Sequence, residues 1–458
     1  MKRLFGTDGM RGEAGRFPLD AAAVRSAGGS LARHLRARLG RAPRILTGRD
    51  TRESGGWIEN SFLEGARAAG ASAESAGRIT TPGVAYLARV LPADAGVVVS
   101  ASHNPFYDNG IKIFSPTGRK LDDETERLIE ADIYAEREDG KGAVAPAPDD
   151  GAAPGSDAAG AALRARYLDH LSGEVGAGLR LDGLRVVIDC ANGAAYELAP
   201  ALFSRLGAEV VAINDAPDGR NINQDCGSLH IDGLRRRVLE ESAQLGVAFD
   251  GDADRSLYVD ARGEFVDGDA TLWVLAKWMQ ERGELNGDRV VATVMSNLGL
   301  ELALRSRRIE LLRTDVGDKY VLEELLRTDA AVGGEQSGHI IFPRVSLAGD
   351  GMITALSLLR VMAETGRTLE ELTEGFVRYP QTLKNVRVRE KLPFEDVREI
   401  ARAARETRAS LGERGRLLLR YSGTEPLARV MIEGPEQTEV ERLAEGLAAV
   451  IRETLGEA

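Results

Sequence analysis

Short apolar runs alternate with amphipathic stretches along most of this 458-residue chain. The apolar runs include RILTG, AGVVVSA, LRVVIDC, AEVVAIN, GVAFD and RVVATVM. Runs of this kind indicate buried strands, while the stretches between them have the pattern of surface helices. Because strands and helices take turns along the sequence, the chain is predicted to adopt an α/β fold built from repeated strand–helix units.

The length of the chain predicts several domains. A chain of 458 residues is too long for one hydrophobic core. Residues 140–160, GKGAVAPAPDDGAAPGSDAAG, contain almost no large apolar side chain and are typical of a linker. Less sharp boundaries fall near residues 256 and 368. We therefore expect four domains, at residues 1–155, 156–256, 257–368 and 369–458.

Composition excludes several classes of protein. The net charge of −12 comes from 59 basic and 71 acidic residues without a basic block, which argues against a nucleic-acid partner. Cys190 and Cys226 are too few for a disulfide framework and lack the spacing of a zinc site, so we expect buried free thiols. The N-terminal MKRLFGTDGMRG lacks the apolar core of a signal peptide, and no run is long enough to span a membrane. We expect a protein of the reduced cytoplasm, with no membrane partner.

Four polar loops interrupt the alternation, and each falls in a different expected domain. They are SASHNP at 100–105, FDGDADR at 249–255, GGEQSGH at 333–339 and RYSGTEPLAR at 420–429. Three of them directly follow a β-rich run, and GGEQSGH follows the shorter run AAV. Ligands of open α/β sheets bind beyond the carboxyl ends of the strands. A single site built from all four loops would therefore lie in a cleft between domains.

The first loop places a hydroxyl group beside a titratable ring. In VVVSASHNPFYDNGIKIF, Ser102 precedes His103, and Lys112 follows ten residues after the serine. A well-capped turn would also be rich in Ser, Asn, Asp and Gly. Whether the loop carries chemistry therefore depends on the other three.

The second loop carries three closely spaced carboxylates. In an extended loop Asp250, Asp252 and Asp254 share one side, where they repel one another unless a hard divalent cation binds. A calcium-binding helix–loop–helix begins with the same pattern, but it needs glycine and glutamate where this chain has Arg255 and Ala261. A solvated acidic turn is the remaining alternative. Mg²⁺ is favoured because it needs few carboxylates and completes its shell with phosphate or water oxygens.

The other two loops have the residue types of phosphate and sugar sites. RYSGTEPLAR combines two arginines with hydroxyl groups and a glycine, which favours phosphate binding over a simple turn before a strand. GGEQSGH holds several donors and acceptors within a short span, which suits a polyhydroxylated ligand, although a helix N-terminal cap is an equal alternative. In GTDGMRG, Arg11 lies between glycines in another turn that suits phosphate.

Together GTDGMRG, SASHNPFYDNGIKIF, FDGDADR, GGEQSGH and RYSGTEPLARVMIEG resemble, in order, the signature motifs of the α-D-phosphohexomutases. The resemblance covers the whole chain. It implies three α/β domains with mixed sheets and a smaller α+β C-terminal domain around a central cleft. Within the superfamily, VVATVMSNLGLELAL, LLRTDVGDKYVLEEL and GEQSGH are most similar to the phosphoglucosamine mutases, since members acting on glucose or mannose phosphates commonly carry Met in place of Gln336.

The resemblance implies a role for each loop. Ser102 carries a phosphoryl group, and His103, Lys112 and Arg11 handle protons or stabilise the group in transfer. Mg²⁺ is held by a phosphoserine oxygen of Ser102 together with Asp250, Asp252 and Asp254. The implied substrate-binding residues are Arg255, Glu335, Ser337, His339, Arg420, Ser422, Gly423, Thr424 and Arg429.

The implied reaction interconverts glucosamine 6-phosphate and glucosamine 1-phosphate, as an isomerase that supplies amino-sugar nucleotide and peptidoglycan precursor synthesis. Glucosamine 1,6-bisphosphate would serve as intermediate and activator, a hexosamine phosphate as the small-molecule partner, and a homodimer as the assembly. The alternatives are a phosphoglucomutase or phosphomannomutase with the same mechanism, and a non-catalytic sugar-phosphate-binding protein. One departure from the family pattern is SLAGDG, where Leu347 and Ala348 replace hydroxyl residues.

Overall fold

The computed structural model describes residues 3–6, 8–138, 157–422 and 425–456. Most of the expected linker at 140–160 lies outside the described residues. The chain divides into two compact units, which are residues 1–291 with 314–374, and residues 292–313 with 375–458. Among the described residues, no helix is both long and apolar enough to cross a membrane.

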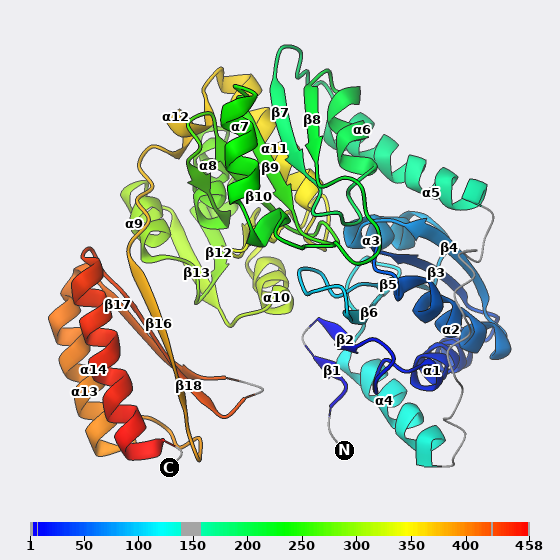
Figure 1. The fold of residues 1–458 in the computed structure, drawn as a ribbon, viewed down its shortest axis with the longest axis horizontal. Coiled ribbons are helices and arrows are strands. Elements are labelled where there is room, and N and C mark those ends of the chain that lie inside the picture. The colour runs from blue at the N-terminus through cyan, green and yellow to red at the C-terminus, as the bar shows by residue number, and fades with distance from the viewer. Residues whose placement is uncertain (1–2, 7, 139–156, 423–424, 457–458) are drawn as a thin grey trace. The chain divides into compact units, whose positions relative to one another are not determined.

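The first sheet has six strands in the order β1-β2-β6-β5-β3-β4 (Figure 1). Its strands are β1 (Phe5–Gly6), β2 (Gly9–Glu13), β3 (Arg44–Arg49), β4 (Ser72–Arg78), β5 (Ala95–Val99) and β6 (Asp108–Phe114). Its helices are α1 (Ala21–Leu39), α2 (Gly55–Ala68), α3 (Thr81–Val90) and α4 (Asp123–Glu138). Strand β3 runs parallel to β4 and β5, whereas β6 is antiparallel to β5. One core joins α1, α2 and α4 to side chains such as Val97 and Ile111.

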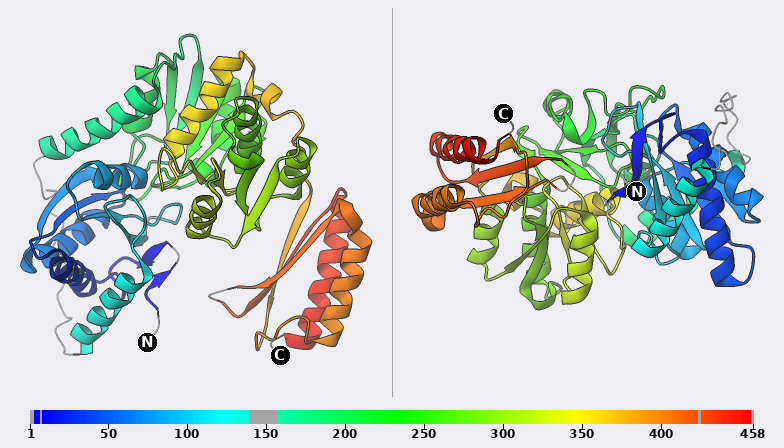
Figure 2. Two further views of the ribbon diagram at one scale, coloured as in Figure 1. Left: turned by 180° about the vertical axis from the view of Figure 1, so that it is seen from behind. Right: turned by 90° about the horizontal axis from the view of Figure 1, so that it is seen from below.

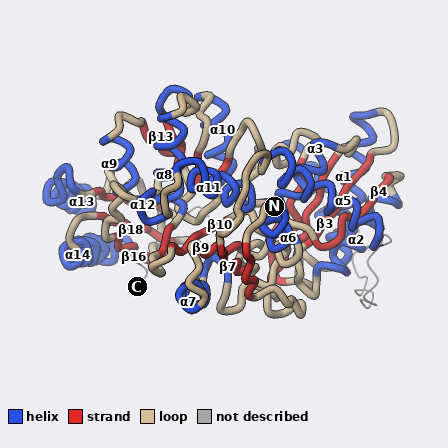
Figure 3. The backbone as a smooth tube through the Cα atoms, turned by 90° about the horizontal axis from the view of Figure 1, so that it is seen from above, coloured by secondary structure: helices blue, strands red, loops and turns tan. Residues whose placement is uncertain are grey.

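The second sheet has five strands in the order β11-β10-β9-β7-β8. Its strands are β7 (Arg185–Asp189), β8 (Glu209–Ile213), β9 (Leu245–Phe249), β10 (Ser256–Asp260) and β11 (Phe265–Val266). Its helices are α5 (Asp157–His170), α6 (Leu198–Arg205) and α7 (Asp232–Glu240). Helix α7 packs against β7 and β9, beside which it lies in Figure 3. The parallel strands β7 and β9 lead toward the same edge of the sheet, where the polar loop at 250–255 begins.

The third sheet has the order β13-β12-β14-β15. Its strands are β12 (Arg289–Thr293), β13 (Glu310–Thr314), β14 (Gly333–Gly334) and β15 (Ile340–Ile341). The helices of this segment are α8 (Gly268–Glu281), α9 (Leu298–Ser306), α10 (Asp318–Thr328), α11 (Gly351–Thr365) and α12 (Leu369–Thr373). The loop GGEQSGH connects β14 to β15, so it is a tight turn between strands and not the helix cap considered from the sequence.

The fourth sheet has three antiparallel strands in the order β16-β18-β17. Its elements are β16 (Gln381–Arg387), α13 (Arg398–Leu411), β17 (Arg416–Tyr421), β18 (Leu427–Glu433) and α14 (Gln437–Leu455). Both helices pack on one face of this sheet through a shared apolar core that includes Ile400, Val430 and Leu447 (Figure 2). The predicted α/β class, with a smaller α+β C-terminal domain, is confirmed. The arrangement around one cleft and the four domain boundaries stay predictions.

Candidate active site

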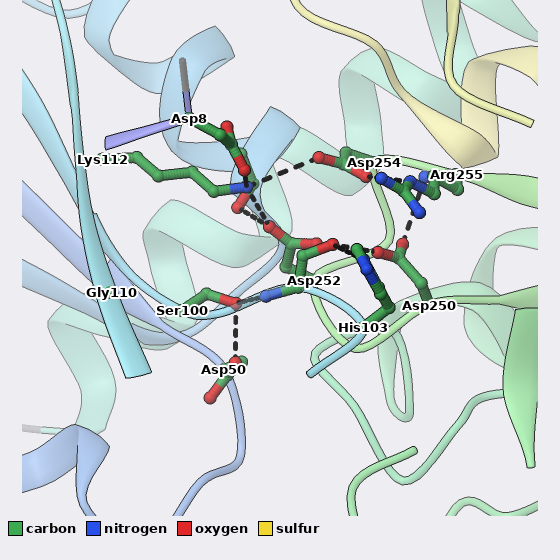
Figure 4. A network of polar contacts seen from close by, with 12 residues as sticks. Asp8, Asp50, Ser100, His103, Gly110, Lys112, Asp250, Asp252, Asp254 and Arg255 are labelled. Atoms are coloured by element: carbon green, nitrogen blue, oxygen red, sulfur yellow. Dashed lines mark hydrogen bonds and ion pairs between the residues drawn. The ribbon is translucent and has the colours of Figure 1, made fainter. Parts of the chain in front are cut away.

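Ser102 lies just beyond β5, in the loop that the sequence singled out. Its side chain is buried, and its backbone is in the left-handed region with φ 53°. The Ser102 Oγ donates a hydrogen bond to the Asp250 Oδ2 over 2.5 Å and lies 3.3 Å from the His103 Nδ1. The predicted nucleophile and the predicted metal loop therefore meet directly, although Ser102 and Asp250 are far apart in sequence. Figure 4 shows His103, the neighbour of Ser102, beside Asp250.

The three aspartates of the second loop converge as the sequence predicted. Asp250, Asp252 and Asp254 are all buried, and each offers an oxygen within 4.8 Å of the others. Burial, followed by the charges of Asp254 and Asp252, raises the pKa of Asp250 well above its usual range. Such repulsion costs free energy in the apo protein, and a bound cation would relieve it.

Two carboxylate oxygens of this group accept no hydrogen bond from the described part of the chain. Asp252 Oδ1 and Asp254 Oδ1 are buried without a hydrogen bond from any described residue. Buried polar atoms are normally paired, so unpartnered oxygens that belong to converging carboxylates mark a place for a ligand. Carboxylate oxygens are the ligands of hard divalent cations, and the residues therefore fit a metal ion of that class.

Lys112 supplies the opposing charge from β6. Its buried Nζ lies 2.8 Å from Asp252, 3.5 Å from Asp254 and 3.2 Å from Asp8. Burial alone would lower the pKa of Lys112, but the three carboxylates outweigh it and raise that pKa. In turn Lys112, helped by a 2.5 Å hydrogen bond from the Thr81 hydroxyl, lowers the pKa of Asp252 against the effect of burial.

Three cationic side chains surround Asp8, namely Arg11, Lys112 and Lys120. Arg11 forms a short ion pair with Asp8, and the Lys120 Nζ lies 2.5 Å from Asp8 and 2.6 Å from Asp318. Burial would raise the pKa of Asp8, but Lys112, Lys120 and Arg11 hold it well below its usual range. Neither Asp8 nor Lys120 was predicted from the sequence as a site residue. Asp8 lies within the motif GTDGMRG, where the suitability of the turn for phosphate points to the arginine and not to a carboxylate.

His103 and Arg255 complete this group of charges. Burial, followed by the charges of Arg255 and Arg11, lowers the pKa of His103 to about 4. The Arg255 Nε lies 3.7 Å from the Asp254 Oδ1, and its backbone N–H donates to the Asp250 Oδ1 over 3.2 Å. Arg255 therefore holds two of the three aspartates from the far end of the loop.

Of the residues predicted in the loop GGEQSGH, His339 lies near the aspartates. The His339 Nε2 lies 4.0 Å from the Asp254 Oδ2, and its Nδ1 is buried without a described partner. The Ser337 hydroxyl donates instead to Glu335 within the loop, over 3.2 Å. Gly268 at the start of α8 fixes the loop, because a Cβ at this position would lie 2.1 Å from the Glu335 carbonyl oxygen.

The fourth loop lies in the second unit, between β17 and β18. Arg420 and Arg429 are direct cross-strand partners, and the Arg429 Nη2 lies 3.4 Å from the Ser422 Oγ. Like charges directly opposite each other destabilise a pair of strands, which an anion bound between them would reverse. The other two predicted residues of this loop, Gly423 and Thr424, lie outside the described residues.

The departure at Leu347 and Ala348 lies beside a pocket of about 490 Å³ within the first unit. Lys120, Asp318 and Lys319 also line this pocket. The Lys319 Nζ forms an ion pair with Asp123 over 2.6 Å.

Both cysteines, Cys190 and Cys226, are buried free thiols, as predicted.

Profiles of one protein family match nearly the whole chain. The family is described as phosphoglucomutase/phosphomannomutase. Its alpha/beta/alpha domain I matches residues 2–140, domain II residues 165–263, domain III residues 267–379, and the C-terminal domain residues 383–450.

Individual relatives extend this finding. A phosphoglucosamine mutase of Solibacter usitatus is 50% identical over 456 residues, covering 100% of both chains. A phosphoglucomutase/phosphomannomutase family protein of Burkholderia thailandensis has a similar structure, with a TM-score of 0.78 and 24% identity over 98% of this chain and 97% of the other. An N-acetylphosphoglucosamine mutase of Aspergillus fumigatus, solved with GlcNAc-6P and magnesium, has a TM-score of 0.65 and 19% identity over 98% of this chain and 95% of the other.

Proposed function

Because the chain belongs to the phosphoglucomutase/phosphomannomutase family, we propose that it interconverts glucosamine 6-phosphate and glucosamine 1-phosphate. It is an isomerase. The choice of glucosamine rests on the full-length likeness to phosphoglucosamine mutases. The observation that carries the chemistry is the 2.5 Å contact between the Ser102 Oγ and Asp250, within a group of aspartates of which two oxygens accept no hydrogen bond from the described residues.

The reaction would proceed in two balanced transfers. In the first, a hydroxyl oxygen of the sugar monophosphate attacks phosphorus on phosphorylated Ser102. The new P–O bond forms on the sugar, the bond from phosphorus to the Ser102 Oγ breaks, and the hydroxyl proton passes to an acceptor at the site. After the resulting bisphosphate turns round, its other phosphoryl group returns to the Ser102 Oγ, and the sugar oxygen left behind takes up a proton. No atom is gained or lost, as an isomerisation requires.

The side chains around Ser102 are assigned proton transfer, electrostatic stabilisation and metal binding. His103 is assigned the proton transfer, because its Nδ1 lies 3.3 Å from the Ser102 Oγ. Lys112 and Arg11 are fixed positive charges that favour the transferring phosphoryl group electrostatically. Asp250, Asp252 and Asp254 would hold Mg²⁺ together with a phosphoserine oxygen. When bound, that ion neutralises charge on the phosphoryl oxygens.

The second unit is assigned the phosphate that is not being transferred. Arg420 and Arg429, with Ser422, present guanidinium groups and a hydroxyl on one hairpin. We assign Gly423 and Thr424 to the same phosphate site. A site of this kind is needed because each end of the bisphosphate must be held while the other reacts. Arg255, Glu335, Ser337 and His339 are assigned to the sugar.

The proposal includes a cofactor and a setting. Mg²⁺ and a hexosamine phosphate occur together in the Aspergillus fumigatus protein, which supports both ligands for this chain. Glucosamine 1,6-bisphosphate would act as activator by phosphorylating Ser102. We assign the reaction to cytoplasmic amino-sugar and peptidoglycan precursor synthesis. A homodimer stays a prediction.

A substrate panel tests the proposal. The purified chain is given the 6-phosphates of glucosamine, glucose and mannose with Mg²⁺ and a trace of the matching bisphosphate, and each 1-phosphate is measured. We expect the highest kcat/KM for glucosamine. A higher value for glucose or mannose would favour the alternative mutases. No turnover of any substrate, with sugar-phosphate binding retained, would favour the non-catalytic protein.

A further inference from the structure

The carbonyl oxygen of Ser102 is held by three different parts of the first unit. The Arg52 Nη2 and the Asn223 Nδ2 each donate a hydrogen bond to it over 2.9 Å. The metal loop closes the third side, since a Cβ on Gly251 would lie 2.5 Å from the same oxygen. Loops that follow β3, β5, β8 and β9 therefore meet at one main-chain atom, on the residue proposed to carry the phosphoryl group.

Arg52 is built into this position. Its side chain is fully buried and pairs with Asp50 over 2.9 Å. The same guanidinium also donates to the Asn104 carbonyl over 2.8 Å and to the Pro105 carbonyl. A buried arginine is costly unless its donors are satisfied, and here main-chain carbonyls of the phosphoserine loop satisfy them.

Asp50 extends the same contacts to the amide side of the serine. The Ser100 hydroxyl donates to the Asp50 Oδ2 over 2.6 Å, and the Ser102 backbone N–H donates to the Ser100 Oγ over 2.9 Å. Ser102 is thus fixed at both its N–H and its C=O while its φ is 53°. A residue other than glycine stays in this region only when its surroundings hold it there.

Asn223 connects the loop to the second sheet. Besides the Ser102 carbonyl, its Nδ2 donates to the Asn104 carbonyl over 3.1 Å. A Cβ on Gly251 would lie 2.8 Å from that same Nδ2, so the asparagine lies between the phosphoserine loop and the metal loop.

We infer that Arg52 and Asn223 are positioning residues for phosphoryl transfer, which set the Ser102 Oγ relative to the aspartates. The inference rests on the proposed function. Among the described residues, neither side chain forms a hydrogen bond or ion pair with the Ser102 Oγ, with Asp250, Asp252 or Asp254, or with a predicted substrate-binding side chain. Their effect reaches the chemistry through the main chain of Ser102. Misplacement of a reacting atom by about 1 Å can cost about a hundredfold in rate, so a loosened carbonyl should lower kcat while leaving KM nearly unchanged.

Asn223→Gly tests the inference with a matched control. Glycine removes the amide and tolerates the positive φ of this position, 58°. Asn192→Gly is the control, because Asn192 is similarly buried, has φ 48°, and donates to Asn221 and not to the phosphoserine loop. We expect kcat to fall about tenfold to a hundredfold in Asn223→Gly with an unchanged KM, and the control to keep wild-type kcat. Equal kcat in both variants would overturn the inference, as would a fall confined to KM.

Arg52→Lys is the second variant, since it keeps a charge beside Asp50 but cannot reach the same carbonyls. Intact mass reports phosphorylation of Ser102 by added bisphosphate over time. We expect slower phosphorylation in Arg52→Lys and Asn223→Gly, with Mg²⁺ affinity retained. Wild-type rates of phosphorylation in both variants would refute the positioning role. Absence of phosphorylation in the wild-type protein would refute the proposed function itself, which keeps the two failures distinct.

Discussion

Lys112 is a cation that partly neutralises the aspartates at the site. Three aspartates that converge without a cation repel one another, and the Lys112 Nζ neutralises part of that charge at 2.8 Å from Asp252. The ammonium and the cation proposed for the site thus share the same carboxylates. Removing one carboxylate changes the hold on both charges.

Asp252→Asn should lower the affinity for Mg²⁺, so that half-maximal activity requires more Mg²⁺. Loss of an outer partner of a metal ligand typically costs about 10- to 100-fold in metal affinity, so loss of a ligand should cost at least about tenfold. Titration of activity with Mg²⁺ gives the midpoint. Asp169→Asn, in an exposed ion pair on α5, should leave it unchanged. If Asp252→Asn kept the wild-type midpoint and rate, Asp252 would not be a ligand.

Arg429→Ala should raise KM for the monophosphate about tenfold to a hundredfold. A charge-assisted hydrogen bond contributes roughly 1.5–3 kcal/mol, and about 1.4 kcal/mol is a factor of ten. The bisphosphate should also escape more often, so the variant should need more of it to stay active. Arg402→Ala, an exposed arginine of α13, serves as the control. Unchanged KM and bisphosphate requirement would make the hairpin a structural turn.

The loops owe their positions to the strands before them and to close backbone contacts. Ser102 lies just beyond the carboxyl end of strand β5, and Asp250 directly follows the carboxyl end of β9. The short β14–β15 turn is held differently, because α8 begins against it at Gly268. A side chain at that point would displace the loop.

Gly268→Ala should therefore raise KM more than it lowers kcat. The added Cβ would meet the Glu335 carbonyl at 2.1 Å, which forces the sugar loop to move. Steady-state kinetics with glucosamine 6-phosphate measures the effect. Gly233→Ala on α7, where a Cβ meets nothing within 4 Å, should behave as wild type. An unchanged KM in Gly268→Ala would mean that the loop does not bind the sugar.

Over the whole chain, sequence patterns predicted the elements and the loops, but not the contacts that join them. The alternation of apolar runs predicted the α/β class, and spacing predicted that Asp250, Asp252 and Asp254 would converge. The partners Asp8 and Arg52 were missed. Each depends on tertiary contacts across strands and loops distant in sequence, which local periodicity does not encode. The substrate class was predicted from the resemblance to a family, and it could not be predicted from single residues.

Phosphorylation of Ser102 is the most direct test of the proposed phosphoserine mechanism. Wild-type protein and Ser102→Ala are treated with phosphatase, incubated with glucosamine 1,6-bisphosphate and Mg²⁺, and compared by intact mass and by release of the monophosphate. We expect one added phosphoryl group and stoichiometric monophosphate with the wild type, and neither with Ser102→Ala, which should still bind the sugar phosphate. Phosphorylation of Ser102→Ala at the wild-type level, or substantial mutase turnover by it, would show that Ser102 does not carry the phosphoryl group.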